Sequence, residues 1–172
     1  MIQIPLLQTE RLLLRAPQGS DAGAYQTFYA DAEASKFYEG PKPPHVAWNK
    51  LAAVLGHWHL RGYGIWALER RDSGAFIGAC GLAWPDGWPR SELTWWIAPE
   101  ARQQGFAKEA SRAAIAFGYD LLKWDLVQTH MLDENLAAKA LVLSLGGEVI
   151  ARETFPDGFD RDIYRLPRPD PA

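Results

Sequence analysis

Residues 92–110 read ELTWWIAPEARQQGFAKEA, and this stretch decides the fold. The pattern predicts a strand that ends near Ala98, a loop with Pro99, and a long helix that residues 102–107 open. The first N–H groups of a helix have no partner inside the helix, and the helix dipole adds about half a positive charge there. Because Gly105 and Ala107 carry little or no side chain, an anion can approach this backbone closely. The stretch therefore predicts an anion site at a helix start.

Two basic residues, Arg102 and Lys108, flank the helix start and can add charge-assisted contacts to a bound phosphate. Taken alone, the pattern is equally typical of an ordinary helix start with a close-packing glycine. The two standard phosphate motifs are absent, because no Gly-x4-Gly-Lys-Ser/Thr occurs and Gly62-Tyr63-Gly64 lacks the later glycine of a dinucleotide fingerprint. A nucleotide-binding transferase is therefore the weaker interpretation.

Hydrophobic periodicity and turn residues predict strands and helices on both sides of this stretch. The predicted strands cover residues 11–15, 65–69, 76–82, 92–98, 126–132, 148–153 and 162–166. The predicted helices cover residues 21–31, 45–60, 106–121 and 136–143. A doubly wound nucleotide fold needs a helix between nearly all strands, and this order does not supply it. The order predicts an α/β fold with a mixed, mostly antiparallel sheet flanked by helices.

The composition excludes several classes of protein. A chain of 172 residues predicts a single domain over residues 1–172, with a proline-spaced tail at 167–172 that we expect to fray. A net charge of −3 predicts no basic surface for nucleic acid, and no apolar run is long enough to span a membrane. The single cysteine, Cys80, excludes an internal disulfide, and the histidines lack metal-ligand spacing, so we expect no metal and a cytoplasmic location.

The helix start also resembles motif A of the GNAT superfamily of acyl-CoA-dependent N-acetyltransferases, Gln/Arg-x-x-Gly-x-Gly/Ala, which Arg102, Gly105 and Ala107 satisfy. The resemblance covers residues 9–166 and extends to the RimJ/RimL-like branch, which contains the ribosomal-protein alanine acetyltransferases. Further matching pieces are TERL at 9–12, GYGIWA at 62–67, IGACGL at 77–82, ELTWWI at 92–97, NLA at 135–137 and LGG at 145–147. The resemblance implies a sheet that splays between its fourth and fifth strands, with acyl-CoA in the gap.

The resemblance also implies which residues hold acetyl-CoA. Backbone groups of Ile97 and Ala98 would pair with the pantetheine arm as an added strand would. The N–H groups of residues 103–108 would cradle the pyrophosphate. Asn135 would bind the pantetheine or orient the acyl end, and Lys139 would reach a phosphate or remain a solvated lysine. The implied cofactor-binding residues are Ile97, Ala98, Arg102, Gln103, Gln104, Gly105, Phe106, Ala107, Lys108, Asn135 and Lys139.

Catalysis in this family is a direct transfer, in which a neutral amine attacks the thioester carbonyl. The resemblance implies Glu92 as the general base, directly or through water, with Asn135 as the second catalytic residue. Strand alternation places Glu92, Thr94 and Trp96 on one face. A carboxylate among tryptophans is expected to have a raised pKa. The alternative is that Glu92 points into solvent and has no catalytic role.

The chain departs from the branch pattern at two positions. The family often has Ser where this chain has Ala138, and often has Tyr where this chain has Trp95. Neither alanine nor an indole N–H is a practical acid, so the group that protonates the leaving thiolate is not identified. This departure motivates the alternative of a non-catalytic acyl-CoA-binding or protein-interaction module on the same fold.

Acceptor selection is expected from the two N-terminal helices and the last hairpin. The expected substrate pocket contains Phe37, Tyr38, Trp66, Trp95 and Phe155, and Trp48, Trp58 and Phe159 are placed near the same mouth. Each of these aromatic residues, taken alone, is more typical of a core. Asp157 and Asp160 are candidates to attract a cationic amine. The expected acceptor is a primary amine, either a protein N-terminus or a small molecule, and a homodimer is plausible.

Overall fold

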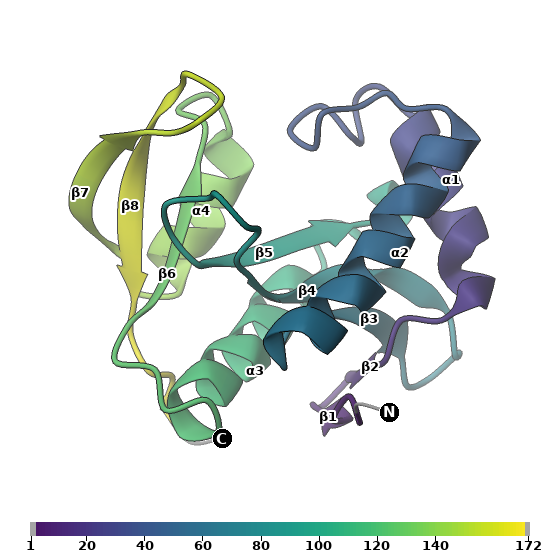
Figure 1. Ribbon diagram of the computed structural model, residues 1–172. Helices are drawn as coiled ribbons and strands as arrows, with labels where there is room; N and C mark the ends of the chain where they lie inside the picture. The colour runs from purple at the N-terminus through teal and green to yellow at the C-terminus, as the bar shows by residue number, and fades with distance from the viewer. Residues whose placement is uncertain (1–2, 171–172) are drawn as a thin grey trace.

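The computed structural model describes residues 3–170, which form two antiparallel sheets and four α-helices (Figure 1). The strands are β1 (Leu7–Gln8), β2 (Leu12–Arg15), β3 (Ile65–Arg70), β4 (Phe76–Ala83), β5 (Glu92–Ile97), β6 (Val127–Met131), β7 (Glu148–Thr154) and β8 (Asp160–Leu166). The α-helices are α1 (Ala22–Ala30), α2 (Pro44–Arg61), α3 (Phe106–Asp120) and α4 (Leu136–Ser144). Two 3-10 turns, η1 (Gly19–Asp21) and η2 (Pro99–Ala101), complete the order. Every predicted helix and strand is confirmed, and β1 was not predicted because two residues give no periodicity.

The sheets divide at the point where the family resemblance implied a splay. One sheet has the order β1-β2-β3-β4-β5 and the other β6-β8-β7, and every ladder is antiparallel. The hydroxyl of Thr129 on β6 donates to the carbonyl of Leu93 on β5 at 2.8 Å. No ladder joins β5 to β6 within residues 3–170. The two strands therefore touch near the start of β5 and separate beyond it, which leaves one edge of β5 free.

The two faces of the larger sheet are covered by different helices. On one face α3 packs against β2, β4 and β5, and Leu93 and Ile97 belong to the core on that side. On the other face the ring of Trp96 stacks on Phe28 at 4.2 Å and meets the edge of Tyr25 at 5.1 Å. Aromatic pairs of this kind contribute about 0.5–1.5 kcal/mol each beyond the area that they bury. This packing fixes the register of β5, with its even-numbered side chains toward α1.

One glycine lets β4 and β5 approach closely. Gly78 has a φ of +148°, and a Cβ built there would lie 2.1 Å from the carbonyl oxygen of Trp96. A side chain at this position would force the two strands apart. The IGACGL piece is thus explained by strand packing next to the site.

The C-terminal segment after β8 has no regular structure in its described part. Residues 167–170 lie against α3, where Arg168 pairs with Asp120 and the guanidinium of Arg112 donates to the carbonyl of Asp170 at 3.4 Å. The end of the tail, residues 171–172, lies outside the described residues. Within residues 3–170, none of the helices combines the length and the apolar character needed to cross a bilayer.

Candidate active site

The start of α3 has the geometry of an anion nest. Gly105 caps the helix with a φ of +82°, and Gln103 also has a positive φ of 59°. The first N–H group of the helix with a partner in the ladder is that of Glu109, which donates to the carbonyl of Gly105 at 3.1 Å. Among residues 3–170, the N–H groups of residues 103–108 have no acceptor. These free donors and the helix dipole suit a pyrophosphate.

A clamp of three side chains holds the nest from behind. Arg11 pairs with Glu109 at 2.7 Å and also donates to the carbonyl of Gln104 at 2.9 Å. The other oxygen of Glu109 accepts from the Thr9 hydroxyl at 2.6 Å and from the Arg11 N–H at 2.8 Å. Burial opposes the charge of Glu109, but these hydrogen bonds outweigh it and lower the pKa of the carboxyl. From the sequence alone the TERL piece had no role, and this clamp supplies one.

A groove of about 570 Å³ runs from the nest along β5 to the start of α4. The predicted cofactor residues that line it are Ile97, Arg102, Gln103, Gly105, Phe106, Ala107, Lys108 and Asn135. Lys36 adds a positive charge that was not predicted, and Glu33 is the one carboxylate in the lining. Gln104 and Lys139 do not line the groove: the Gln104 side chain donates to Glu100, and Lys139 is exposed on α4.

Ile97 and Ala98 were expected to pair with pantetheine, and the hydrogen bonds of β5 separate the two residues. The N–H of Ala98 donates to Ile77, and its carbonyl accepts from Ala101, both at 2.9 Å. The N–H of Ala98 is therefore not free to pair with pantetheine, because it extends the pairing of β5 with β4. In this register the backbone groups of Trp95 and Ile97 point away from β4, into the gap.

On this free edge of β5 the carbonyl groups have hydrogen-bond partners within residues 3–170, whereas the N–H groups do not. The carbonyl of Ile97 accepts from Arg102 at 3.0 Å, and Arg102 also reaches the carbonyl of Ala34 at 3.2 Å. Arg102 thus ties the segment after α1 to the end of β5, besides adding charge to the groove. The N–H groups of Trp95 and Ile97 have no protein acceptor within the described residues. The edge offers two hydrogen-bond donors to an extended ligand.

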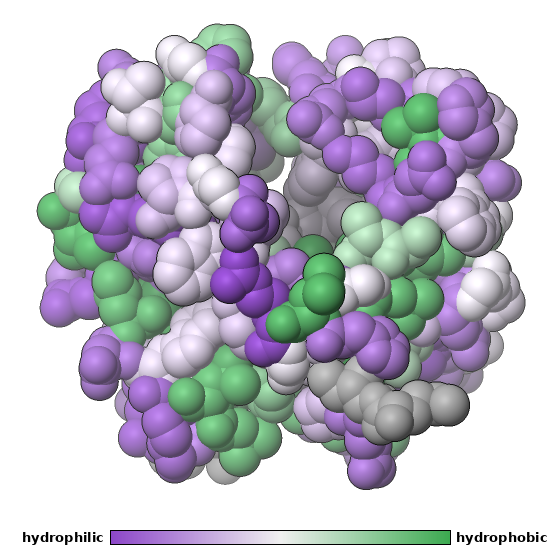
Figure 2. Space-filling model, viewed as in Figure 1, coloured by the Kyte–Doolittle hydropathy of each residue, from purple (hydrophilic) through white to green (hydrophobic). Residues whose placement is uncertain are grey.

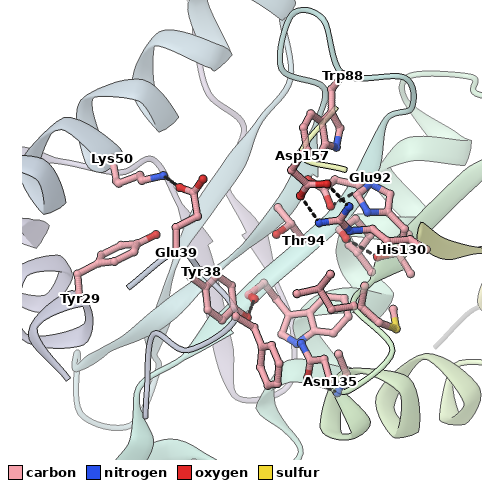
Figure 3. A pocket seen from close by; sticks show the side chains of 18 residues that line it. Tyr29, Tyr38, Glu39, Lys50, Trp88, Glu92, Thr94, His130, Asn135 and Asp157 are labelled. Atoms are coloured by element: carbon pink, nitrogen blue, oxygen red, sulfur yellow. Dashed lines mark hydrogen bonds and ion pairs between the residues drawn. The ribbon is translucent and has the colours of Figure 1, made fainter. Parts of the chain in front are cut away.

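A second cavity, of about 300 Å³, adjoins the groove (Figures 2 and 3). Figure 2 shows the surface hollowed between the part with β6–β8 and the part with α1 and α2. Trp88, Asp157, Glu92 and His130 lie on one side of the cavity, and Tyr29, Glu39 and Lys50 face them from the other (Figure 3). The residues that line both the groove and the cavity are Phe37, Tyr38, Trp95, Asn135 and Ala138, which we call the junction.

Glu92 is placed as the sequence predicted, with its side chain on the cavity face of β5. Burial raises the pKa of the Glu92 carboxyl to about 7, and the nearby charge of Arg161 opposes this rise. His130, on β6, has Nε2 at 3.4 Å from a Glu92 oxygen. Burial, together with Arg161 and Arg90, lowers the pKa of His130 to about 4. A neutral histidine thus faces a carboxyl that ionises near neutral pH, as a general base requires.

The other charges of the cavity are paired with one another. Lys50 contacts Glu39 at 2.5 Å, and Arg161 binds both oxygens of Asp157 at 2.5 and 2.8 Å. Asp157 is therefore not free to attract an amine. Asp160, the other candidate, accepts from the Thr154 hydroxyl at 2.6 Å and does not line the cavity. Both hairpin aspartates were candidates to attract an amine, but Arg161 at the start of β8 neutralises Asp157.

Asn135 has a structural role at the junction. It caps α4, since its side-chain oxygen accepts from the N–H of Ala138 at 3.2 Å. Its own N–H donates to Leu132 at 2.9 Å. The cap leaves the side-chain amide nitrogen as the donor that can reach a ligand at the junction.

Three of the five predicted pocket aromatics line the site, and two do not. Phe37, Tyr38 and Trp95 line both the groove and the cavity. Trp66 is fully buried and donates to the carbonyl of Pro5 at 2.8 Å, so it belongs to the core under α3. Phe155 does not line the cavity and packs against His130, which does; their ring centroids are 4.3 Å apart.

The aromatics placed near the mouth also lie elsewhere. Trp58 is core, whereas Trp48 and Phe159 are 52% and 56% exposed and line neither the groove nor the cavity. The unpredicted lining residues come from distant segments, and no local motif marks them. They include Tyr29, Glu39, Lys50, Trp88, His130 and Arg161.

The site can be compared with known proteins. The family model described as the acetyltransferase (GNAT) domain matches residues 11–148. The uncharacterized N-acetyltransferase YoaA of Bacillus subtilis (strain 168) is 25% identical over 173 residues, which cover 96% of this chain and 98% of that protein. The crystal structure of an acetyltransferase from Agrobacterium tumefaciens str. C58 superposes with a TM-score of 0.87 at 27% identity, covering 96% of each chain.

A more distant structure shares the fold. RimL, a ribosomal L7/L12 alpha-N-protein acetyltransferase solved in complex with coenzyme A, has a TM-score of 0.76 at 14% identity. The match covers 96% of this chain and all of that one. At this identity the likeness concerns the fold alone.

Proposed function

The chain belongs to the GNAT acetyltransferase family, and we propose that it transfers the acetyl group of acetyl-CoA to a primary amine. One observation carries the proposal. A groove that starts at a nest of free N–H groups meets, at the junction, a cavity that holds a carboxyl with a raised pKa. The groove suits a long anionic thioester, and the cavity suits the amine that attacks it.

The groove has the donors that coenzyme A requires. The N–H groups of residues 103–108 would hold the pyrophosphate, and Lys36 and Lys108 add positive charge beside it. The N–H of Ile97 on the free edge of β5 would donate to an amide carbonyl of the pantetheine arm, as in pairing with an added strand. When bound, acetyl-CoA supplies an acetyl group activated as a thioester.

The cavity residues would carry out the proton transfer. The amine attacks the thioester carbonyl in its neutral form, and Glu92 accepts the proton that the nitrogen loses, directly or through one water. The amide nitrogen of Asn135 and the N–H of Trp95 are the donors at the junction for the oxyanion that develops.

The acceptor is a protein N-terminus or a small-molecule amine. Because Glu39 and Asp157 already have cationic partners, a second positive charge on the acceptor would have to displace Lys50 or Arg161. Such an exchange gains little electrostatic energy. The cavity therefore favours an amine whose remaining part is polar and uncharged, which the hydroxyls of Tyr29 and Thr94 in the lining can bind.

The alternative is a non-catalytic acyl-CoA-binding module. It is motivated by Ala138 and Trp95, which carry no acid where the family often has one. One experiment separates the two functions: purified protein is first melted with and without CoA, acetyl-CoA, ATP or NAD. It is then incubated with acetyl-CoA and a panel of amines, and acetylated products are detected by mass spectrometry.

Each outcome of that experiment favours one function. A ligand at about 100 times its Kd stabilises a protein by about 2.7 kcal/mol, which raises the Tm of a chain this size by about 5–10 °C. If the protein is an acetyltransferase, the Tm should rise with CoA and acetyl-CoA only, and acetylated amine should form. The same rise without any product supports the binding module, and no rise with either CoA compound contradicts both.

A further inference from the structure

The junction lacks the acid expected at two positions, yet it contains a hydroxyl. Of the five junction residues, Tyr38 alone carries one, and Tyr38 comes from the segment between α1 and α2. Ala138 has no polar side-chain atom, and the amide of Asn135 and the indole of Trp95 do not titrate near neutral pH. The Tyr38 hydroxyl is therefore the side-chain O–H that the junction offers to a ligand lying where groove and cavity meet.

The Tyr38 side chain is held in position by its surroundings. Its ring meets that of Phe28 edge to face, with centroids 5.4 Å apart. Its N–H donates to the carbonyl of Ser35 at 2.8 Å, inside a turn that the Ser35 N–H ties to Asp31 at 3.0 Å. These contacts fix both the ring and the backbone, so the position of the hydroxyl is set before a ligand binds.

The hydroxyl of Tyr38 donates to the carbonyl of Trp95. That carbonyl lies on the free edge of β5 and points into the gap between the sheets. It is the acceptor that an amide N–H of an extended ligand would take when pairing with this edge. A ligand bound there would release the Tyr38 hydroxyl at the junction.

We propose that the Tyr38 hydroxyl, released in this way, is the hydrogen-bond donor to the thioester sulfur as it leaves. This inference rests on the proposed acetyl transfer. As the new C–N bond forms, Glu92 takes the proton of the nitrogen. The C–S bond then breaks, its electron pair moves to sulfur, and the hydroxyl of Tyr38 donates to the thiolate. Glu92 loses its proton to solvent, and the thiolate gains one from solvent, so the protons balance.

Tyr38 acts as a donor and keeps its proton. Burial raises the pKa of Tyr38 above its usual value, and the positive charge of Arg102 opposes this rise. An ordinary thiol has a pKa of about 8.5, lower than the phenol's ordinary value of about 10, so the proton stays on the phenol. The hydrogen bond lowers the barrier to C–S cleavage by stabilising negative charge on sulfur, as a charge-assisted bond does.

The direct test is the pKa of the CoA thiol in its complex with the protein, followed through the ultraviolet absorbance of the thiolate. A donor to sulfur favours the thiolate and lowers this pKa. Tyr38→Phe keeps the ring and removes the donor, so the pKa of bound CoA should rise by about one unit relative to wild type. Tyr63→Phe is the matched control, since Tyr63 lies beside His57 and Trp124, away from groove and cavity, and should leave the titration unchanged.

Steady-state kinetics give the second readout. Tyr38→Phe should lower kcat about 10-fold, while the Kd for CoA falls or stays within about 3-fold, because the Trp95 carbonyl no longer has to be vacated. A bound thiol that titrates alike in wild type and Tyr38→Phe, in proteins of equal Tm, would overturn the role of Tyr38. Failure of the wild type to bind CoA or to acetylate any amine would instead overturn the proposed function.

Discussion

The groove and the cavity meet at five residues, yet they are built from different chemical groups. The groove offers mainly backbone donors: the N–H groups of residues 103–108 and those on the free edge of β5. The cavity offers side chains, among them Glu92, Lys50 and Arg161, contributed by segments far apart in the chain. Backbone donors are the same for every residue type except proline, so the groove depends on chain conformation. The cavity depends on which side chains are present, and we expect it to determine the acceptor.

The largest expected effect is in the groove. Gly105→Glu places a carboxylate at the nest and imposes a side chain on a φ of +82°, so CoA affinity should fall at least 100-fold. Calorimetric titration with CoA measures it. Gly74→Glu is the matched control, because Gly74 also has a positive φ, of 70°, with open space around it in the β3–β4 turn. Normal CoA binding by Gly105→Glu would show that the nest does not hold the cofactor.

The second effect is in the cavity and should leave the groove intact. Glu92→Gln should lower kcat by about 100-fold or more with little change in CoA affinity, because the base is lost and the fold of β5 is kept. Glu148→Gln, at an exposed ion pair on β7, is the control. Steady-state rates and CoA titrations on the same preparations make the comparison. Equal losses of kcat and CoA affinity would contradict the division between the two regions.

The pH profile of the same pair of proteins sharpens this prediction. Burial raises the pKa of Glu92 to about 7, so the carboxylate form that accepts a proton gains population as pH rises through 7. The kcat/KM of the wild type should rise over that range. Glu92→Gln should lose the limb near pH 7 and keep only the limb that belongs to the amine substrate. A limb near pH 7 that persists in the variant would assign the titration to another group.

Much of the groove follows from the sequence because its parts are contiguous. The strand, loop and helix at 92–110 lie in one stretch, so their spacing brings Gly105 and Lys108 together at the helix start, and both line the groove. Ala98 was expected to pair with pantetheine, but its N–H is taken by the carbonyl of Ile77, a partner that spacing does not identify. Trp66 was assigned wrongly because composition shows that aromatic residues are plentiful without showing which face of the sheet each one occupies.

The cavity follows from the sequence only in part. Glu92 was expected from the family resemblance of its strand, and Tyr38 as one of the aromatic residues placed near the acceptor mouth; both line the cavity. His130 and Arg161 were missed, because tertiary packing brings β6 and β8 against β5 and no local pattern encodes that approach. The ion pair of Asp157 with Arg161 also depends on tertiary packing, and it removes Asp157 as a free carboxylate for a cationic amine.

A smaller effect is expected at the clamp behind the nest. Arg11→Met should lower CoA affinity about 10-fold and stability by about 1 kcal/mol, because Arg11 fixes Glu109 and the carbonyl of Gln104 from an exposed position. The hydrogen bonds of Thr9 and Arg11 lower the pKa of Glu109, so their contribution is present above pH of about 4 and is lost as pH falls below it. Urea unfolding at pH 7 and pH 3 measures this: the difference between wild type and variant should shrink at pH 3, and an unchanged difference would contradict the clamp.

The smallest effect concerns acceptor choice. Lys50→Met frees the Glu39 carboxylate to meet a second ammonium group, so kcat/KM for a diamine should rise about 3-fold relative to a neutral amino amide. Competition between the two amines, read by mass spectrometry, gives the ratio directly. Lys123→Met, on the segment after α3, is the control because it changes the same charge away from the cavity. An unchanged ratio would show that Glu39 does not contact the acceptor.

In the proposed function, acetyl-CoA held in the groove delivers its acetyl group to an amine beside Glu92. The most direct measurement saturates the protein with acetyl-CoA, adds a mixture of primary amines at pH 7.5, and follows free CoA and acetylated amine over a single turnover. We expect both products to appear together in equal amounts, and we expect Glu92→Gln, which still binds acetyl-CoA, to form them at least 100-fold more slowly. Acetyl-CoA that binds and remains intact with every amine, or equal rates in the two proteins, would contradict this proposal.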